Sequence, residues 1–158
     1  ASKGARRTLR YVEPLRDART KLADFFSILF ELEEAMSKTA LVVDDSPTMR
    51  QMVAFTLTNA GFQVVEAEHG KDAVNKVAGG PKMDIVVTDL NMPEMDGISL
   101  IKELRKMAAF KFTPILMLTT ESAADKKQAG KEAGATGWIV KPFNPDVMLK
   151  IIAKVLPA

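Results

Sequence analysis

Short apolar runs that end in charged residues are the feature that most constrains how this chain can fold. Unbroken runs rich in β-branched residues are typical of buried parallel strands, whose carboxyl ends lie along one edge of a sheet. Unpaired charge beside a core is costly, so packing alone does not explain charged residues at these positions. The pattern therefore predicts a functional site at one edge of a sheet. The runs and the charges that follow them are residues 40–43 with Asp44 and Asp45, residues 85–88 with Asp89, and residues 138–140 with Lys141.

The composition is that of an ordinary globular protein, and it excludes several classes of function. The 158 residues are 47% hydrophobic and 27% charged, which fits one domain with an appendage. A net charge of +2 is too small to indicate nucleic acid or a membrane surface as a partner. Because the chain has no cysteine, disulfides, thiolate zinc sites and cysteine catalysis are excluded. No apolar run reaches the roughly 18 residues of a membrane helix and no secretion signal is visible, so we expect a cytoplasmic protein.

Residues 1–35 form a first segment, which opens with small and basic residues and then takes on a helical pattern. Pro14 suits the first turn of a helix, and we expect this helix to run from about residue 14 to residue 35. Apolar residues recur at alternating steps of three and four, which is the heptad seam of helices that pack on one another. An apolar helix face this wide must pack against another surface. The seam residues are Leu15, Ala18, Leu22, Phe25, Leu29, Leu32 and Met36.

Residues 36–158 form a second segment, in which five predicted strands alternate with five predicted helices. Ser46-Pro47 is a favourable helix start, because serine caps helices and proline suits the first helical position. The alternation predicts an α/β fold with a doubly wound parallel sheet, in which ligands bind beyond the carboxyl ends of the strands. The predicted strands are 40–44, 63–66, 84–88, 114–119 and 137–140, and the predicted helices are 47–60, 70–78, 97–108, 122–133 and 145–156.

The three aspartates at the strand ends indicate a Mg²⁺ site. Carboxylates that lie close together repel one another, and a divalent cation removes that repulsion. Mg²⁺ prefers oxygen ligands and binds through one or two carboxylates together with water and phosphate oxygens. Asp45 and Asp89 are candidates for direct ligands, and Asp44 for holding a metal-bound water. The alternative is that Asp44 caps the following helix and Asp45 is merely solvated, but a third aspartate at another strand end weighs against it.

Asp89 has the features of a nucleophile toward phosphorus. A carboxylate at a strand end beside a metal ion is placed like the phosphate acceptor of aspartyl-phosphate ATPases. Phosphoryl transfer depends on charge neutralisation and in-line positioning more than on acid–base groups, and Lys141 would share the neutralisation with the metal. Thr119, at the end of the fourth run, could donate its hydroxyl to a phosphoryl oxygen; the alternative is that its β-propensity alone places it there.

Four motifs then identify a resemblance, and their order and spacing are those of one family. They are residues 42–46, residues 87–93 with Asp96-Gly97, residues 117–119, and residues 137–143. With these motifs, residues 36–158 resemble a bacterial response-regulator receiver domain of the stand-alone, CheY-like chemotaxis type. The resemblance implies a flavodoxin-like, doubly wound sheet of five parallel strands in the order 2-1-3-4-5 with five helices. The extra amphipathic helix of the first segment would precede it.

The resemblance also implies roles for the site residues. Asp89 would be the phosphoacceptor, which takes a phosphoryl group from a histidine kinase. Mg²⁺ would be bound by Asp44, Asp45 and Asp89, with the main-chain carbonyl of Asn91 as another ligand. Lys141 would contact the phosphoryl group.

Three further residues occupy positions that modulate the switch in this family. Thr119 would be the switch hydroxyl, which is drawn toward the phosphate. Trp138 takes the aromatic switch position, where chemotaxis proteins commonly carry tyrosine. Asn91 and Glu121 take positions that tune how fast water attacks the acyl phosphate.

The resemblance implies output by protein contact. Phosphorylation would change the partner preference of the face made by the fourth helix, fifth strand and fifth helix of the receiver. The chain ends soon after that helix, so we expect a partner protein to carry the output, with the flagellar motor switch as the leading candidate. The only catalysis expected is self-phosphorylation and self-dephosphorylation, so the chain is not a conventional enzyme.

Two other functions share this architecture. A Mg²⁺-dependent phosphatase of the aspartyl-phosphate class also uses aspartates at strand ends, but it usually has a second aspartate where this chain has Asn91. A flavin-binding protein of the same fold predicts a Ser/Thr-rich phosphate loop after the first strand. The acidic residues 44–45 are electrostatically unsuited to such a loop.

Residues 1–35 depart from the family pattern. They contain no histidine, asparagine or glutamine, so they lack both a phosphohistidine donor and the amide by which auxiliary phosphatases orient water. Three interpretations of this segment are open. We favour an appended or fused helix that docks on the receiver, and the second is a helix that mediates dimerisation through its heptad seam. The third is a disordered leader, which the apolar stripe disfavours.

Overall fold

The computed structural model of the chain describes residues 14–120 and 124–156. The chain divides into two compact units, with the boundary between Met36 and Ser37. The first unit contains one long helix, α1 (Pro14–Met36), so the extra N-terminal helix predicted from the heptad seam is present. None of the described helices has the length and apolar character needed to span a membrane.

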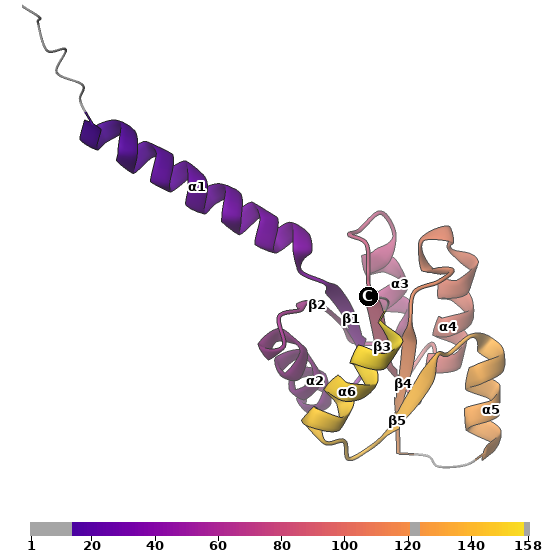
Figure 1. Cartoon of the computed structure of the whole chain (residues 1–158). Coiled ribbons are helices and arrows are strands. Elements are labelled where there is room, and N and C mark those ends of the chain that lie inside the picture. Colours follow the sequence, from indigo (N-terminus) through magenta and orange to yellow (C-terminus); the bar gives the residue numbers. More distant parts are fainter. Residues whose placement is uncertain (1–13, 121–123, 157–158) are drawn as a thin grey trace, which may run out of the picture. The chain divides into compact units, whose positions relative to one another are not determined.

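The second unit is built on five parallel strands in the order β2-β1-β3-β4-β5, which confirms the predicted topology. The three central strands are almost wholly buried, whereas the outer strands β2 and β5 are partly exposed. Figure 1 shows the five strands side by side. The strands are β1 (Thr39–Val43), β2 (Gln63–Ala67), β3 (Ile85–Asp89), β4 (Ile115–Thr119) and β5 (Gly137–Val140).

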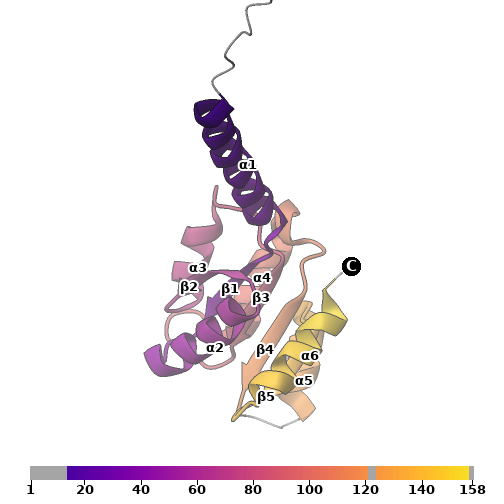
Figure 2. The ribbon, with the colours of Figure 1, turned by 60° about the vertical axis from the view of Figure 1, so that its left-hand side comes forward.

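Helices cover both faces of this sheet, because alternate residues of each strand point to opposite sides (Figure 2). Leu41 and Val43 of β1 lie in one core, and Ala40 and Val42 lie in the other. The first core is closed by α3 (Gly70–Val77), α4 (Gly97–Lys106) and α5 (Ala124–Ala133). The second core is closed by α2 (Pro47–Asn59) and α6 (Pro145–Val155).

The helix starts follow the local sequence signals. The Ser46 hydroxyl accepts a hydrogen bond from the main-chain N–H of Met49 at 3.4 Å, with proline at the first position of α2. Asp96 caps α4 and Asn144 caps α6 in the same way. These side chains satisfy main-chain donors that have no partner within a helix.

The predicted helix 97–108 is wrong at its end. The α4 helix stops at Lys106, because Met107 takes an extended conformation with ψ of 130°. A short 3₁₀ helix, η1 (Ala108–Phe110), follows and buries the ring of Phe110 in the first core, where it is only 3% exposed. Burial of this aromatic side chain favours the break over two more residues of regular helix.

Arg105 holds the amino-terminal edge of the sheet together by binding main-chain carbonyls. Its Nη1 donates to the carbonyls of Phe110 and Thr113 at 2.6 and 2.7 Å, and its Nη2 donates to the carbonyl of Gly134 at 2.7 Å. Burial lowers the pKa of the Arg105 guanidinium, as expected for a cation whose described partners are neutral carbonyls. One side chain therefore joins the end of α4, the η1 turn and the end of α5.

We predict that Arg105→Ala lowers the free energy of unfolding by about 2 kcal/mol or more, because several carbonyls lose a charged donor. Urea unfolding followed by circular dichroism measures the change. Lys106→Ala is the matched control, because the neighbouring side chain is 71% exposed and pairs only with Glu103 among the described residues. Its expected effect is within about 0.5 kcal/mol. Equal losses for the two variants would contradict this role of Arg105.

Candidate functional site

The register of the sheet brings the predicted charged residues to one edge. Val43 is paired with Thr88 in the sheet, so Asp44 follows β1 next to Asp89 at the end of β3. The last residue of β4, Thr119, is paired with Val140 at the end of β5. The main-chain N–H of Lys141 donates to the Thr119 carbonyl at 2.8 Å, which fixes the start of the lysine side chain at the same edge.

The three aspartates form one cluster. Each of Asp44, Asp45 and Asp89 offers a carboxylate oxygen, and these oxygens lie within 4.8 Å of one another. Asp44 and Asp89 are 1% and 8% exposed, whereas Asp45 is open to water. Two ligand oxygens of an octahedral Mg²⁺ ion lie no more than about 4.2 Å apart, a separation that small side-chain movements in this cluster reach. The oxygen donors and their spacing therefore fit a Mg²⁺ ion.

Lys141 lies against two of the three carboxylates. Its Nζ is 3.2 Å from Asp44 Oδ2 and 3.1 Å from Asp89 Oδ1, and only 13% of the side chain is exposed. Opposite charges at this distance and depth attract more strongly than an exposed pair, because water screens them less. One positive charge thus lies against two nearly buried negative charges, and one negative charge remains in excess.

The local contacts of Asp44 exclude the alternative in which it caps the following helix. The cap of α2 is Ser46, and Asp44 Oδ1 instead accepts a hydrogen bond from the main-chain N–H of Ser46 at 2.8 Å. The Arg50 side chain donates to the Asp44 carbonyl at 2.7 Å and lies 3.4 Å from a Glu66 carboxylate oxygen. No sequence pattern singled out Arg50, although its position one turn into α2 lies close to the end of β1.

Main-chain contacts with the residues that follow fix the position of Asp89. Its Oδ1 accepts a hydrogen bond from the main-chain N–H of Leu90 at 2.9 Å. The carbonyl of Leu90 in turn accepts from the N–H of Gly97 at 2.8 Å, where α4 begins. A Cβ atom at Gly97 would collide with the carbonyl oxygen of Asp89. Glycine is therefore required for α4 to start directly against the end of β3.

The pKa of the Asp89 carboxyl is raised above its ordinary value. Burial is the largest cause, and the negative charge of Asp44 adds to it, while Lys141 and the Leu90 N–H act in the opposite direction. A raised pKa means that the folded protein destabilises the ionised form of Asp89 relative to its protonated form. A bound cation that neutralises this charge, or a reaction that removes it, therefore relieves the unfavourable electrostatic energy.

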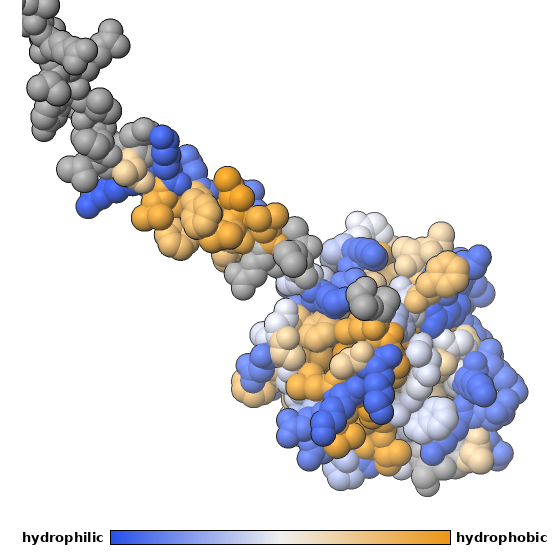
Figure 3. Space-filling view, viewed as in Figure 1, coloured by the Kyte–Doolittle hydropathy of each residue, from blue (hydrophilic) through white to orange (hydrophobic). Residues whose placement is uncertain are grey.

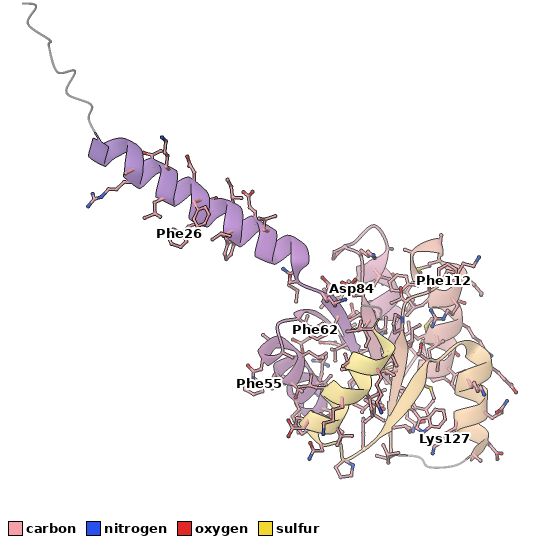
Figure 4. All side chains as sticks on the ribbon, viewed as in Figure 1. Phe26, Phe55, Phe62, Asp84, Phe112 and Lys127 are labelled. Carbon is pink, nitrogen blue, oxygen red and sulfur yellow. The ribbon has the colours of Figure 1, made fainter. Side chains whose placement is uncertain are left out.

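Of the other predicted residues, the structure describes Thr119, Asn91 and Trp138. Thr119 is 2% exposed at the end of β4, and Asn91 is exposed two residues after Asp89. Trp138 on β5 is 37% exposed, and Lys127 of α5 places its Nζ 4.9 Å from the centroid of the indole ring (Figure 4). Glu121 lies outside the described residues.

We predict that Asp89→Asn stabilises the metal-free protein at pH 7 by on the order of 1 kcal/mol, because it removes a buried negative charge beside Asp44. Since the folded-state pKa is raised, the ionised carboxylate costs stability above that pKa, and the cost disappears below the ordinary carboxyl pKa. The advantage of the variant over the wild type should therefore shrink as the pH falls toward about 3.5.

Thermal unfolding in EDTA over a series of pH values tests this. Asp45→Asn is the comparison, because its carboxylate is exposed to water and should give a smaller gain. A gain for Asp89→Asn that is the same at every pH would contradict the electrostatic origin of the effect.

Comparison with known families and proteins agrees with the geometry. The response regulator receiver domain matches residues 40–153. The chain is 43% identical over 117 residues to the chemotaxis protein CheY1 of Helicobacter pylori, covering 73% of this chain and 94% of that protein. It is 41% identical over 117 residues to the chemotaxis protein CheY homolog of Campylobacter jejuni, covering 73% and 90%.

A solved structure shows the same likeness. The chemotaxis protein CheY4 of Vibrio cholerae, crystallised at low pH, superposes with a TM-score of 0.73 and 48% sequence identity. The alignment covers 76% of this chain and 99% of that one. The receiver-domain match over residues 40–153 lies in the second unit and includes the acidic cluster.

Proposed function

Since the chain belongs to the response regulator receiver family, we propose that it is a chemotaxis response regulator that is phosphorylated on Asp89 by a histidine kinase. One observation carries the proposal. Three carboxylates lie within 4.8 Å of one another, and a nearly buried lysine contacts two of them at 3.1 and 3.2 Å. An acidic cluster with a lysine ammonium fixed beside it suits phosphoryl transfer, which depends mainly on positioning and charge neutralisation.

In the proposed reaction, an Asp89 carboxylate oxygen attacks the phosphorus of a phosphohistidine on the kinase. The new O–P bond forms as the P–N bond breaks, and the bonding pair returns to the imidazole, which takes up a proton from water. Among the described residues, the contacts of the Asp89 side chain with Leu90 and Lys141 both involve Oδ1. We therefore assign the attack to Oδ2.

Asp44, Asp45 and Asp89 would hold Mg²⁺, with the main-chain carbonyl of Asn91 as a further ligand. When bound, the ion would neutralise the carboxylates and the phosphoryl oxygens. Lys141 already contacts Asp89 Oδ1, so its ammonium needs to move little to donate to a phosphoryl oxygen on that residue. Thr119 would donate its hydroxyl from the end of β4, and Asn91 and Glu121 would tune the attack of water on the acyl phosphate.

Signalling would follow from the charge added at this edge of the sheet. The phosphoryl group brings strong acceptors beside Thr119 and Lys141, and these favour one arrangement of the neighbouring loop and of Trp138. The face formed by α5, β5 and α6 carries exposed Trp138, Val140 and Val147, which suit a protein partner. We propose an output protein such as the flagellar motor switch as that partner.

The decisive experiment is incubation with acetyl phosphate and Mg²⁺, followed by intact-mass measurement. We expect the wild type to gain the mass of one phosphoryl group and Asp89→Asn to gain none. Asp84→Asn is the matched control, because Asp84 lies just before β3, at the opposite edge of the sheet, and should leave phosphorylation intact. A wild-type chain that never gains this mass overturns the mechanism.

A second prediction concerns metal binding and pH. Because the pKa of Asp89 is raised, protons should compete with Mg²⁺ at higher pH than they would at an ordinary aspartate. Isothermal titration calorimetry should show Mg²⁺ affinity falling as the pH is lowered from about 7.5 to about 4. Affinity that stays constant over this range would show that the buried carboxylates do not bind the ion.

A further inference from the structure

Helix α1 exposes a broad apolar face that no other described residue of its own unit covers. Over residues 18–32, the part of α1 whose side chains are described, seven large apolar side chains are 43–63% exposed. Figure 3 shows them as an orange band along the helix. Apolar surface of this extent marks a site of association. The seven residues are Leu22, Phe25, Phe26, Ile28, Leu29, Phe30 and Leu32.

The spacing of these residues indicates that the occupant is another helix. Leu22, Phe25, Leu29 and Leu32 follow one another at steps of three, four and three, which is the seven-residue repeat of a two-helix coiled coil. Such a repeat keeps one stripe facing a second helix along its whole length. A sheet or an irregular groove would not require this period.

The charges along α1 favour a second copy of the same helix in the opposite direction. Of the four charged residues in 14–22, three are basic, whereas the four in 23–36 are all acidic. Two copies side by side in the same direction would align basic with basic and acidic with acidic ends. Two antiparallel copies place each basic half beside an acidic half, which gains attraction in both.

We propose that α1 pairs with α1 of a second copy as an antiparallel coiled coil centred near Ser27. In this register Leu22 packs against Leu32 of the second copy, and Phe25 packs against Leu29. All four seam residues then meet a seam residue, as antiparallel packing requires. The result is a dimer that carries two receiver units, which strengthens binding to a partner with repeated sites.

The same register accounts for the residues that widen the face. Phe26, labelled in Figure 4, and Ile28 stand on either side of the seam. In the antiparallel pair each would lie near its own equivalent across the two-fold axis. Phe25 and Phe26 form an edge-to-face pair with ring centroids 6.0 Å apart, which extends the aromatic surface at the centre of the helix. The widest part of the apolar face thus falls where the two helices would cross.

The first test is the mass of the full chain in solution, measured by light scattering. We expect about twice the chain mass of 17.3 kDa. Leu22→Glu and Leu29→Glu should give monomers, whereas Ser27→Glu, on the outer side of α1 at the same level, should remain dimeric. Phosphorylation by acetyl phosphate should be unchanged in all three, which separates this proposal from the proposed function. A monomeric wild type overturns the proposal and instead favours docking of α1 on its own receiver.

The second test decides the direction of the helices. Because the chain has no cysteine, Leu22→Cys and Leu32→Cys each introduce a single thiol. When the two variants are mixed and oxidised, the antiparallel register predicts a disulfide-linked dimer that neither variant forms alone. Disulfide formation by each variant alone would indicate parallel helices and overturn the proposed pairing.

Discussion

The contact of Lys141 with Asp44 and Asp89 is the interaction on which the site depends. Two carboxylates at the ends of adjacent buried strands are tolerable only with a cation close by, because burial and mutual repulsion both oppose their charge. The remaining excess of negative charge, together with exposed Asp45, is what makes the cluster fit a divalent cation. The pKa of the Asp89 carboxyl is raised mainly by burial, and the negative charge of Asp44 adds to it.

The sheet provides this arrangement through its strand order. Because β1 and β3 are adjacent and β4 and β5 follow, the carboxyl ends of four strands meet at one edge. The Asp44–Asp89 pair therefore follows two inner strands at this edge, and Lys141 reaches it from the end of β5. Gly97 completes the site, because α4 starts against the carbonyl of Asp89 without the collision that a side chain would cause. Arg105 secures the opposite edge through main-chain carbonyls.

The two units differ in how they bury their apolar side chains. The receiver buries most of its apolar strand residues in two cores, one on either side of the sheet. Helix α1 has a wide apolar face, and its described residues form no core of their own. In the proposed function and pairing, a switch and an association helix are joined in one chain, and α1 requires a second surface before its apolar residues are removed from water.

The sequence by itself determined the α/β class, the strand positions within one or two residues, and Asp44, Asp45, Asp89 and Lys141 as a set. Those features are local, because apolar runs set the strands and the residue after each run lies at the sheet edge. The break after Lys106 and the roles of Arg50 and Arg105 were decided by the tertiary structure. An arginine on a helix looks solvated until the fold brings carbonyls of other elements to it, as it brings the Gly134 carbonyl to Arg105. Such contacts depend on packing between elements, which no local pattern encodes.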